Sequence, residues 1–445
     1  MKTFHKGGVH PNDHKLNADA PAQILTYDGP LCIMVSQHLG APSVPIVKRG
    51  DKVKRGQPLT ENTAFVGSVV HAPVSGLIQN VSEAPDTGNF ARPAIFIQPE
   101  GDESEDFIVD DPTLDRKIRL SPGEIIERIK AMGVVGLGGA CFPTHVKLSI
   151  PKDCKAEYLL INGVECEPFL TDDYRLMLDK PDEILVGIHI LMKALSVQKA
   201  IIGIEANKPK AIALLKEKAA AYTGITVEAL KMKYPQGAEK QLVKALTGRE
   251  VPSGKLPVHA GCVIQNVGTC FAVYEAVQKH KPLTERLVTV TGPCVESPRN
   301  FWVKIGTPVS ALVEACGGLP ENTGKIVAGG PMMGKALPHL NLPVTKGLSA
   351  LLLLPEEQAH RRAAEHCIRC GKCVEACPMG LEPYLLHAAV RNQRMDLCER
   401  HHITDCIECG CCQYTCPSFR PLLDTLRLGK SKVNQIIRNR NTPHQ

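Results

Sequence analysis

Eight cysteines toward the carboxyl-terminal end of the chain follow one spacing twice. The stretches HCIRCGKCVEACPMG (366–380) and DCIECGCCQYTCPSF (405–419) each contain C-x2-C-x2-C-x3-C-P. Three closely spaced thiolates on a tight loop can bind three irons of a cubane cluster, and in paired motifs the fourth cysteine binds the partner cluster. The spacing therefore predicts two [4Fe–4S] clusters with exchanged fourth ligands. One set comprises Cys367, Cys370, Cys373 and Cys416, and the other comprises Cys377, Cys406, Cys409 and Cys412.

Zinc is the alternative metal for closely spaced cysteines. Structural zinc sites use two C-x2-C pairs separated by a loop, which together supply four thiolates. Three cysteines at three-residue spacing, found twice, fit that pattern poorly and favour iron–sulfur clusters. The segment between the two motifs is long and helix-prone, so this region resembles an α-helical dicluster ferredoxin. Cys398 and Cys411 lie outside the repeated spacing, and we do not expect them to bind iron.

A glycine-rich stretch, GVVGLGGACFPTHVKL (133–148), indicates a second kind of chemistry. Glycines let backbone N–H groups approach a phosphate group closely, because no Cβ stands in the way. The stretch matches neither G-x-G-x-x-G nor G-x4-G-K-[ST], the two standard nucleotide-binding patterns. From these residues alone, a tight turn before a helix is as well supported as a phosphate site.

Four stretches, in the same order along the chain, resemble the FMN- and NADH-binding subunit of respiratory complex I. The glycine stretch resembles that family's GRGGAGFPTG-x-K loop, and NGVECEP (162–168) is similar to N-A-D-E-x-E-P. Further along, YPQGAEKQLVKAL (234–246) is similar to Y-x-x-G-E-E-T-A-L-x, and IQNVGT (264–269) is similar to N-N-V-E-T. The resemblance implies an FMN site and an NAD(H) site on an α/β domain.

The same resemblance implies roles for individual side chains. The glycine backbone would approach FMN, Lys147 would face the phosphate or the flavin, and two asparagines would bind the ribityl chain. Three glutamates would hydrogen-bond the nicotinamide and its ribose, although a solvated loop is the alternative for Glu165 and Glu167. The implied catalytic residues are Glu165, Glu167 and Glu239. The implied cofactor-binding residues are Gly136, Gly138, Gly139, Lys147, Asn162, Glu165, Gly237 and Asn266.

Three positions depart from the complex I pattern. Leu137 replaces the family arginine, Ala238 replaces the first glutamate of Gly-Glu-Glu, and Val164 replaces an acidic residue. The loop therefore carries less charge than in complex I. The single-cluster motif of complex I is also absent from this sequence, where the ferredoxin pair takes its place.

Hydrophobic patterning predicts the elements that position these residues. Ser121 and Glu124 form a capping box for a helix that ends at Gly133. Beyond it, expected strands alternate with expected helices: strands at 157–163, 199–205 and 224–232, and helices at 181–195 and 208–222. This alternation predicts a parallel sheet covered by helices, with ligands at the carboxyl ends of the strands.

The whole chain is expected to be a multidomain α/β protein. Residues 47–78 alternate in short apolar runs between glycines and resemble a lipoyl/biotinyl barrel-sandwich, but the stretch ENTAFVGSVV (61–70) has no lysine to carry a swinging cofactor. The acidic stretch 99–112 is expected to be a solvated linker. The predicted domains are a barrel-sandwich (1–110), a Rossmann-like FMN/NADH-binding domain (120–280), a β-grasp SLBB domain (284–354), an α-helical dicluster ferredoxin domain (356–425) and a basic tail (426–445).

Composition excludes some functions. The net charge of +6 is spread along the chain and aromatic residues make up 4%, which argues against a nucleic-acid surface. No apolar run reaches the roughly 18–20 residues that span a bilayer, and MKTFHKGGVHP lacks the apolar core of a signal peptide. A cytoplasmic protein is expected, in which the 18 cysteines are not disulfide-bonded.

Together these features resemble the RnfC family, whose members belong to the Rnf complex, an ion-translocating ferredoxin:NAD oxidoreductase of prokaryotic membranes. The resemblance implies a peripheral protein on the cytoplasmic face of the inner membrane, held there by other Rnf membrane and ferredoxin-like subunits. It would exchange electrons between NAD(H), FMN and two [4Fe–4S] clusters, coupled elsewhere in the complex to Na⁺ or H⁺ movement. A soluble cobalamin reductase of the microcompartment type and a non-catalytic iron–sulfur relay are the alternatives.

Overall fold

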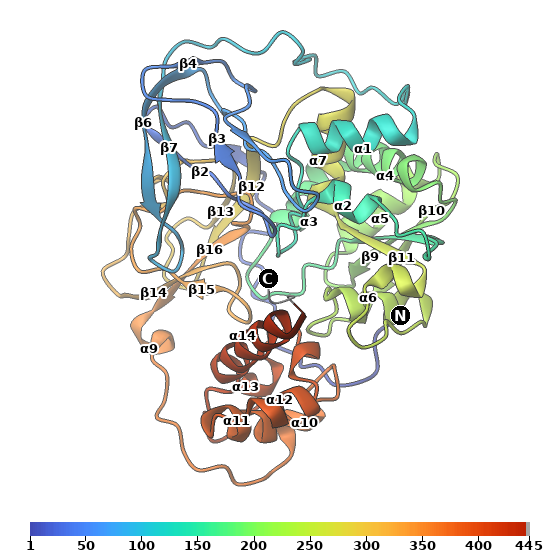
Figure 1. The fold of residues 1–445 in the computed structure, drawn as a ribbon, viewed down its shortest axis with the longest axis vertical. Helices are drawn as coiled ribbons and strands as arrows, with labels where there is room; N and C mark the ends of the chain where they lie inside the picture. Colours follow the sequence, from blue (N-terminus) through green and yellow to red (C-terminus); the bar gives the residue numbers. More distant parts are fainter. Residues whose placement is uncertain (442–445) are drawn as a thin grey trace.

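A four-stranded parallel sheet forms the centre of the α/β domain in a computed structural model that describes residues 1–441 (Figure 1). The strand order is β10–β9–β8–β11, with bounds β8 Tyr158–Asn162, β9 Ala200–Glu205, β10 Ile225–Leu230 and β11 Cys262–Asn266. Successive side chains of a strand point to opposite faces. Leu159 and Ile161 accordingly pack in the large core with the longer helices, while Leu160 packs with Leu242 of the opposite face.

Helices cover both faces of this sheet, as the alternation of strands and helices predicts. Their bounds are α1 Pro122–Ala131, α2 Thr144–Leu148, α3 Asp172–Asp179, α4 Pro181–Leu195, α5 Pro209–Ala219, α6 Glu239–Thr247, η1 Pro257–Ala260 and α7 Val267–Gln278. The predicted capping box of Ser121 and Glu124 is present at the start of α1, and Gly133 follows the helix with φ +63°. Local sequence signals therefore account for this domain well.

The barrel-sandwich has a small apolar core of its own. Its strands are β2 Leu31–Met34, β3 Val44–Pro45, β4 Lys52–Val53, β5 Thr60–Glu61, β6 Gly76–Pro85 and β7 Ala91–Pro99. The longest hairpin joins β6 to β7 and extends beyond the stretch that suggested the sandwich. Residues 62–70 form no strand, because Asn62 holds this turn through hydrogen bonds to Ala41 and Ser43.

The acidic stretch between the first two domains is anchored rather than solvated. Arg55 donates from Nε to Ser104 Oγ at 2.8 Å and forms an ion pair with Asp110. Lys279 at the end of α7 donates to the carbonyl oxygens of Asp111 and Thr113 at 2.7 and 2.6 Å. The expectation of a free linker is wrong because cations distant in sequence bind it.

A six-stranded sheet forms the β-grasp unit, in the order β1–β13–β12–β16–β14–β15. Its bounds are β1 Gln23–Ile24, β12 Glu285–Thr291, β13 Arg299–Lys304, α8 Val309–Glu314, β14 Thr323–Ala328, β15 Lys335–Ala336, β16 Ala350–Pro355 and α9 Glu356–Ala359. The edge strand β1 comes from the start of the chain and pairs in parallel with β13. Nearby, Lys2 pairs with Leu230 of the α/β sheet. The first 24 residues thus pair with domains other than the barrel-sandwich.

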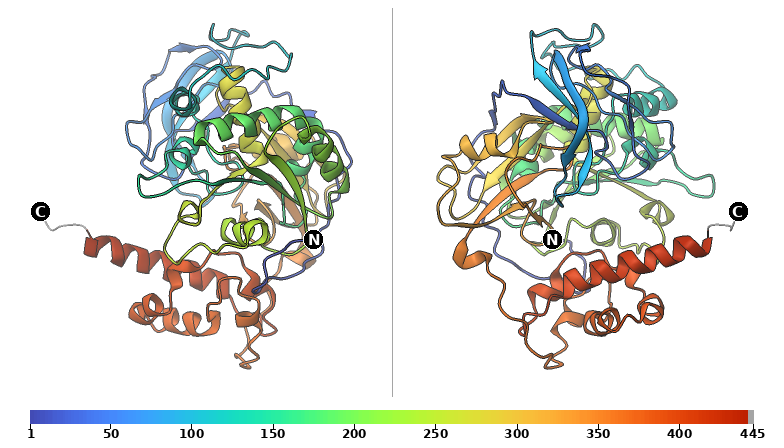
Figure 2. Two further views of the ribbon diagram at one scale, coloured as in Figure 1. Left: turned by 90° about the vertical axis from the view of Figure 1, so that its right-hand side faces the viewer. Right: turned by 60° about the vertical axis from the view of Figure 1, so that its left-hand side comes forward.

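Short helices build the cysteine-rich domain below the α/β domain (Figures 1 and 2). They are α10 Lys372–Glu375, α11 Pro383–Arg391, α12 Met395–Arg400, η2 Ile403–Asp405, α13 Cys411–Tyr414 and the long α14 Leu422–Asn441. Leu426 and Val433 of α14 are buried in this domain's core. The predicted tail from residue 426 is therefore a helix of the domain as far as residue 441, and residues 442–445 lie outside the described residues. No helix within residues 1–441 is both long and apolar enough to cross a bilayer.

Candidate functional site

Two asparagines mark the carboxyl-terminal edge of the parallel sheet. Asn162 ends β8 and Asn266 ends β11, and the two residues are paired in register. Asn162 Nδ2 donates to the carbonyl oxygen of Gly237 at 2.9 Å, and Asn266 Oδ1 accepts from Gly268 N at 2.7 Å as the N-cap of α7. Ligands of parallel sheets bind at this edge. The structure therefore brings together three of the residues predicted to hold the cofactor.

The glycine loop lies against the first turn of α7. Leu137 N donates to Thr269 Oγ1 at 3.0 Å, and a Cβ on Gly138 would lie 3.0 Å from the Cβ of Asn266. Gly139 has φ +148°, which side chains rarely allow, and no atom lies within 4 Å of where its Cβ would be. The loop thus needs glycine and presents its backbone to open space, which fits the close approach of a bound FMN.

Lys147 and Glu239 form the polar wall of this space. Lys147 Nζ lies 2.5 Å from Glu239 Oε1 and 3.4 Å from the carbonyl oxygen of Ile264, which belongs to β11. The Glu239 side chain is 44% exposed and begins α6. A partly exposed cation beside open backbone suits a phosphate or a reduced flavin, and an accessible carboxylate suits a ribose.

Glu165 has structural partners at both carboxylate oxygens. Oε1 accepts from Asp173 N at 2.8 Å and Tyr174 N at 3.2 Å in the first turn of α3, where a negative charge is favourable. Oε2 lies 3.5 Å from Lys15 Nζ and 3.9 Å from Lys208 Nζ, and the side chain is 2% exposed. Its proposed catalytic role stays a prediction, because the fold already uses this carboxylate.

Glu167 connects the α/β domain to the β-grasp unit. Its carboxylate accepts from the backbone N of Met332 at 3.1 Å and of Met333 at 2.8 Å. Burial raises the pKa of Glu167 to about 7, although these two N–H groups oppose the rise. The solvated-loop interpretation does not describe these two glutamates. Contact of Glu167 with a nicotinamide also stays a prediction.

Sequence patterns did not reveal a buried charge cluster behind the loop. Asp173 Oδ2 accepts from Asn266 Nδ2 at 2.7 Å, and Arg286 of β12 lies 3.5 Å from Asp172. Burial and the charge of Glu165 raise the pKa of Asp173 to about 7. Two adjacent acidic residues at a helix start normally indicate a solvated first turn, so the sequence carries no sign of this cluster.

We expect Asp173→Asn to flatten the dependence of stability on pH. The folded chain keeps this proton up to about pH 7, whereas an unfolded aspartate loses it near pH ~3.9. The free energy of unfolding therefore falls as the pH rises between these values, and it stays level above them. Asparagine retains an oxygen for Asn266 and has no proton to lose. Its stability relative to the wild type should increase across that window, measured by urea unfolding at several pH values.

A matched control uses the exposed end of the same helix. Asp179 pairs with Arg175 on the surface, so Asp179→Asn should show no comparable dependence on pH through neutrality. A difference between Asp173→Asn and the wild type that stays constant from about pH 4 to 7 would show that Asp173 does not bind the proton.

Four cysteines of the predicted inner set surround one cavity in the carboxyl-terminal domain. The cavity is lined by Cys377, Cys406, Cys409 and Cys412 together with Leu423 and Leu426. Burial, the largest cause, raises the pKa of Cys406 to about 11, and the charges of Cys409 and Cys377 raise it further. The thiol of Cys377, although it belongs to the first motif, therefore lies with thiols of the second. A shared cavity and four thiols fit one iron–sulfur cluster.

The other four cysteines lie at the surface. Cys367 and Cys370 are exposed, and Cys373 and Cys416 are half-buried. Burial raises the pKa of Cys373, and the charges of Cys416 and Cys370 raise it further. Cys416 of the second motif thus lies beside thiols of the first, as the exchanged assignment requires.

A packed contact joins the flavin side of the molecule to the inner cysteines. The Cys166 thiol accepts from Gly237 N at 3.4 Å, and the Tyr234 hydroxyl donates to the carbonyl oxygen of Cys409 at 2.9 Å. Tyr234, Cys409 and Met332 belong to one apolar cluster, against which Cys166 packs. The predicted cofactor loop therefore reaches the inner cysteines through protein packing. Cys166 and Tyr234 were not singled out as functional by sequence, because neither follows a ligand spacing.

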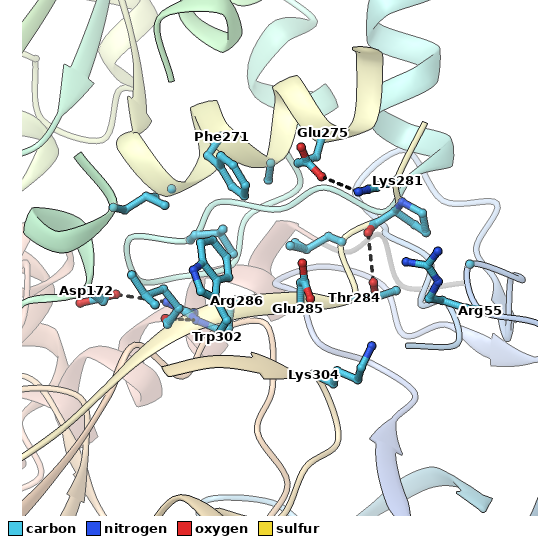
Figure 3. Close-up of a pocket in the computed structure, with 18 of the residues that line it drawn as sticks. Arg55, Asp172, Phe271, Glu275, Lys281, Thr284, Glu285, Arg286, Trp302 and Lys304 are labelled. Carbon is cyan, nitrogen blue, oxygen red and sulfur yellow. Dashed lines mark hydrogen bonds and ion pairs between the residues drawn. The ribbon is translucent and has the colours of Figure 1, made fainter. Parts of the chain in front are cut away.

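A cavity of about 80 Å³ lies on the other side of the glycine loop, between α7, β12 and β13. Figure 3 shows Phe271 and Trp302 side by side in it, with ring centroids 5.4 Å apart. Leu137 lines the inner end of this cavity and belongs to the core of the α/β domain. The residue that replaces the complex I arginine is thus directed into apolar packing.

Comparisons with known proteins agree with this division into domains. Residues 2–102 match the family model of the RnfC barrel sandwich hybrid domain, and residues 129–275 match the Nuo51 FMN-binding domain. Residues 287–336 match the SLBB domain, and residues 359–417 match a 4Fe-4S dicluster domain.

Curated relatives cover most of the chain. The RnfC-type subunit of the proton-translocating ferredoxin:NAD(+) oxidoreductase complex of Clostridium ljungdahlii is 44% identical over 387 residues, which is 87% of this chain and 84% of the relative. Its counterpart in the Na(+)-translocating complex of Acetobacterium woodii is 41% identical over 430 residues, or 96% of each chain. This chain belongs to the RnfC family. The barrel-sandwich match favours this family over the cobalamin reductase alternative.

The matched domains of this RnfC chain support FMN and two [4Fe–4S] clusters as cofactors. Among solved structures, an NAD⁺-reducing [NiFe]-hydrogenase in the air-oxidised state is 20% identical, covering 72% of this chain and 54% of its own, with a TM-score of 0.46. The open glycine backbone and the two sets of thiols are the features of the RnfC chain that fit those cofactors.

Proposed function

We propose that this chain is the NADH-oxidising or NAD⁺-reducing electron-transfer subunit of an ion-translocating ferredoxin:NAD⁺ oxidoreductase complex. The observation that carries the proposal is the packed contact from the glycine loop to the inner cysteines through Cys166 and Tyr234. Bound FMN would supply the step between a two-electron hydride and the one-electron clusters. The exposed outer cysteines would pass electrons to, or receive them from, a neighbouring protein of the complex.

The chain's own residues would divide the work between contact and positioning. Lys147 and Glu239 would contact the cofactor or NAD(H), because they border the open face of the loop. Glu165 and Glu167 would position the loop 162–168, because their carboxylates already bind backbone N–H groups. The buried Asp173 would hold the amide of Asn266 in one orientation.

The setting follows from the family. We propose that the chain lies peripherally on the cytoplasmic face of the inner membrane, held by other Rnf membrane and ferredoxin-like subunits. Movement of Na⁺ or H⁺ would take place elsewhere in that complex. NADH would be the soluble partner.

An anaerobic reduction experiment tests the proposal. The chain is reconstituted with FMN and iron–sulfur clusters, NADH is added, and the visible spectrum is followed. Flavin and cluster absorbance should bleach. Glu239→Gln should slow this bleaching by about tenfold or more, because a hydrogen bond to a charged group contributes about 1.5–3 kcal/mol. Dithionite should still reduce both clusters fully in the variant.

A control on the same helical region separates contact from general charge effects. Glu250 pairs with Lys244 at 2.9 Å and is exposed, so Glu250→Gln should bleach at the wild-type rate. If dithionite reduces the wild-type clusters while NADH does nothing, the chain is an electron relay without a working hydride site. Equal rates for Glu239→Gln and the wild type would remove Glu239 from the site.

A further inference from the structure

Three potential metal ligands converge at the edge of the parallel sheet that lies opposite the glycine loop. One carboxylate oxygen of Asp153, the thiol of Cys154 and one imidazole nitrogen of His259 all lie within 4.8 Å of one another. Asp153 and Cys154 precede β8, and His259 precedes β11. Because the strands are parallel, both segments enter the sheet at its amino-terminal edge, away from the cofactor loop.

Backbone contacts hold the two segments in place. The N–H groups of Glu157 and Tyr158 both donate to the carbonyl oxygen of Gly261, at 2.8 and 3.0 Å. Arg249 donates to the carbonyl oxygen of Ala260 at 2.9 Å and to the Glu157 carboxylate at 2.7 Å. The three ligand side chains are therefore carried by a framework that exists without a metal, and small side-chain rotations would close them around an ion.

The donor atoms have free valences. His259 Nδ1 lies 3.2 Å from the carbonyl oxygen of Leu256, which leaves Nε2 as the nitrogen for a metal. Within residues 1–441, the side chains of Asp153 and Cys154 take part in no hydrogen bond or ion pair. Cys154 is half-buried, and the other two residues are exposed, so a metal could enter from solvent.

We propose that Asp153, Cys154 and His259 bind a zinc ion that ties the two segments together. A thiolate, an imidazole and a carboxylate are the ligand types that Zn²⁺ uses, and water would complete a tetrahedron. Ca²⁺ and Mg²⁺ prefer sites built from oxygen atoms, so this donor set selects against them. The site belongs neither to the iron–sulfur cysteines nor to the flavin loop, and it is independent of the proposed electron transfer.

Bound zinc would stabilise the amino-terminal edge of the sheet. An ion that binds the folded chain more strongly than the unfolded chain raises the melting temperature increasingly as its concentration exceeds Kd. Zinc should therefore raise the melting temperature of the wild type and leave that of Cys154→Ser unchanged. The reduction of the clusters by dithionite should not differ between the two proteins.

Cobalt is the spectroscopic probe for this site. Co²⁺ is added to the full chain after both clusters are reconstituted, so that the cluster cysteines are occupied, and the difference spectrum is recorded. The wild type should bind one Co²⁺ with a thiolate charge-transfer band that added Zn²⁺ abolishes. Cys154→Ser should lose the band. Asp153→Asn and His259→Ala should weaken binding by about tenfold or more, since even residues behind the ligands typically contribute about 10–100-fold.

Cys32→Ser is the matched control, because Cys32 is also half-buried but lies in the barrel-sandwich. It should bind Co²⁺ as the wild type does. An equal band in the wild type and in Cys154→Ser would show that other thiols capture the metal, and the proposal would be wrong. The absence of stoichiometric binding in a wild-type chain with intact clusters would also overturn it.

Discussion

Cys416→Ser is expected to remove the cluster whose other ligands come from the first cysteine motif. In the structure the Cys416 thiol lies beside Cys373, and Cys377 lies with the second-motif thiols around the inner cavity. The substitution should lower the iron content by about half, because one of two four-iron clusters is lost. Iron analysis and electron paramagnetic resonance of the reduced chain measure this result.

Double variants decide between exchanged and unexchanged ligands. If the sets are exchanged, Cys367→Ser and Cys416→Ser destroy the same cluster, and the double variant loses no more iron than either single variant. If each motif binds its own cluster, the double variant loses both. Cys377→Ser combined with Cys406→Ser gives the same test for the inner cluster. Cys398→Ser is the control, because this cysteine is buried outside both sets and its loss should leave the iron content unchanged.

The inner cluster should matter more for reduction by NADH. The Tyr234 hydroxyl bonds to the backbone of Cys409, so the inner set is the one in contact with the cofactor side. Cys377→Ser should therefore prevent NADH from reducing the outer cluster, while dithionite still reduces it directly. Cys416→Ser should leave the reduction of the inner cluster by NADH intact. Reduction of the outer cluster by NADH at the wild-type rate in Cys377→Ser would contradict the proposed order.

Gly139→Ala is expected to release FMN. The residue has φ +148°, and a side chain in such a conformation costs about 1–3 kcal/mol. The loop would relieve that strain by moving its backbone, and the added methyl group would also enter the open space where the flavin fits. We expect FMN to bind about tenfold or more weakly, since about 1.4 kcal/mol corresponds to a factor of ten. Flavin fluorescence during titration of the flavin-free chain measures the affinity.

A second glycine supplies the control for that substitution. Gly123 lies in α1, has no atom within 4 Å of its Cβ position and has no positive φ. Gly123→Ala should leave FMN affinity unchanged and slightly stabilise the helix, by about 0.5–1 kcal/mol. Wild-type FMN affinity in Gly139→Ala would show that the glycine loop does not hold the flavin in this chain.

Local sequence patterns predicted the elements of the α/β domain and the approximate positions of the motifs. The strands around Leu159 and Ile202 and the helix at 181–195 were expected where they occur. Such features depend on periodicity and on capping residues a few positions apart, which are visible in one short window. The β6–β7 hairpin and the pairing of β1 with β13 were not predicted, because register between distant segments leaves no local mark.

The sequence by itself determined that this protein carries two sets of four metal-binding thiols and a flavin-type glycine loop, because the ligands of each lie close together along the chain. Only the tertiary structure decided what the buried acids do. Glu165 binds Lys15 and the start of α3, and Glu167 binds the backbone of Met333. The role of a carboxylate depends on which donors surround it, and here those donors come from segments far apart in the sequence.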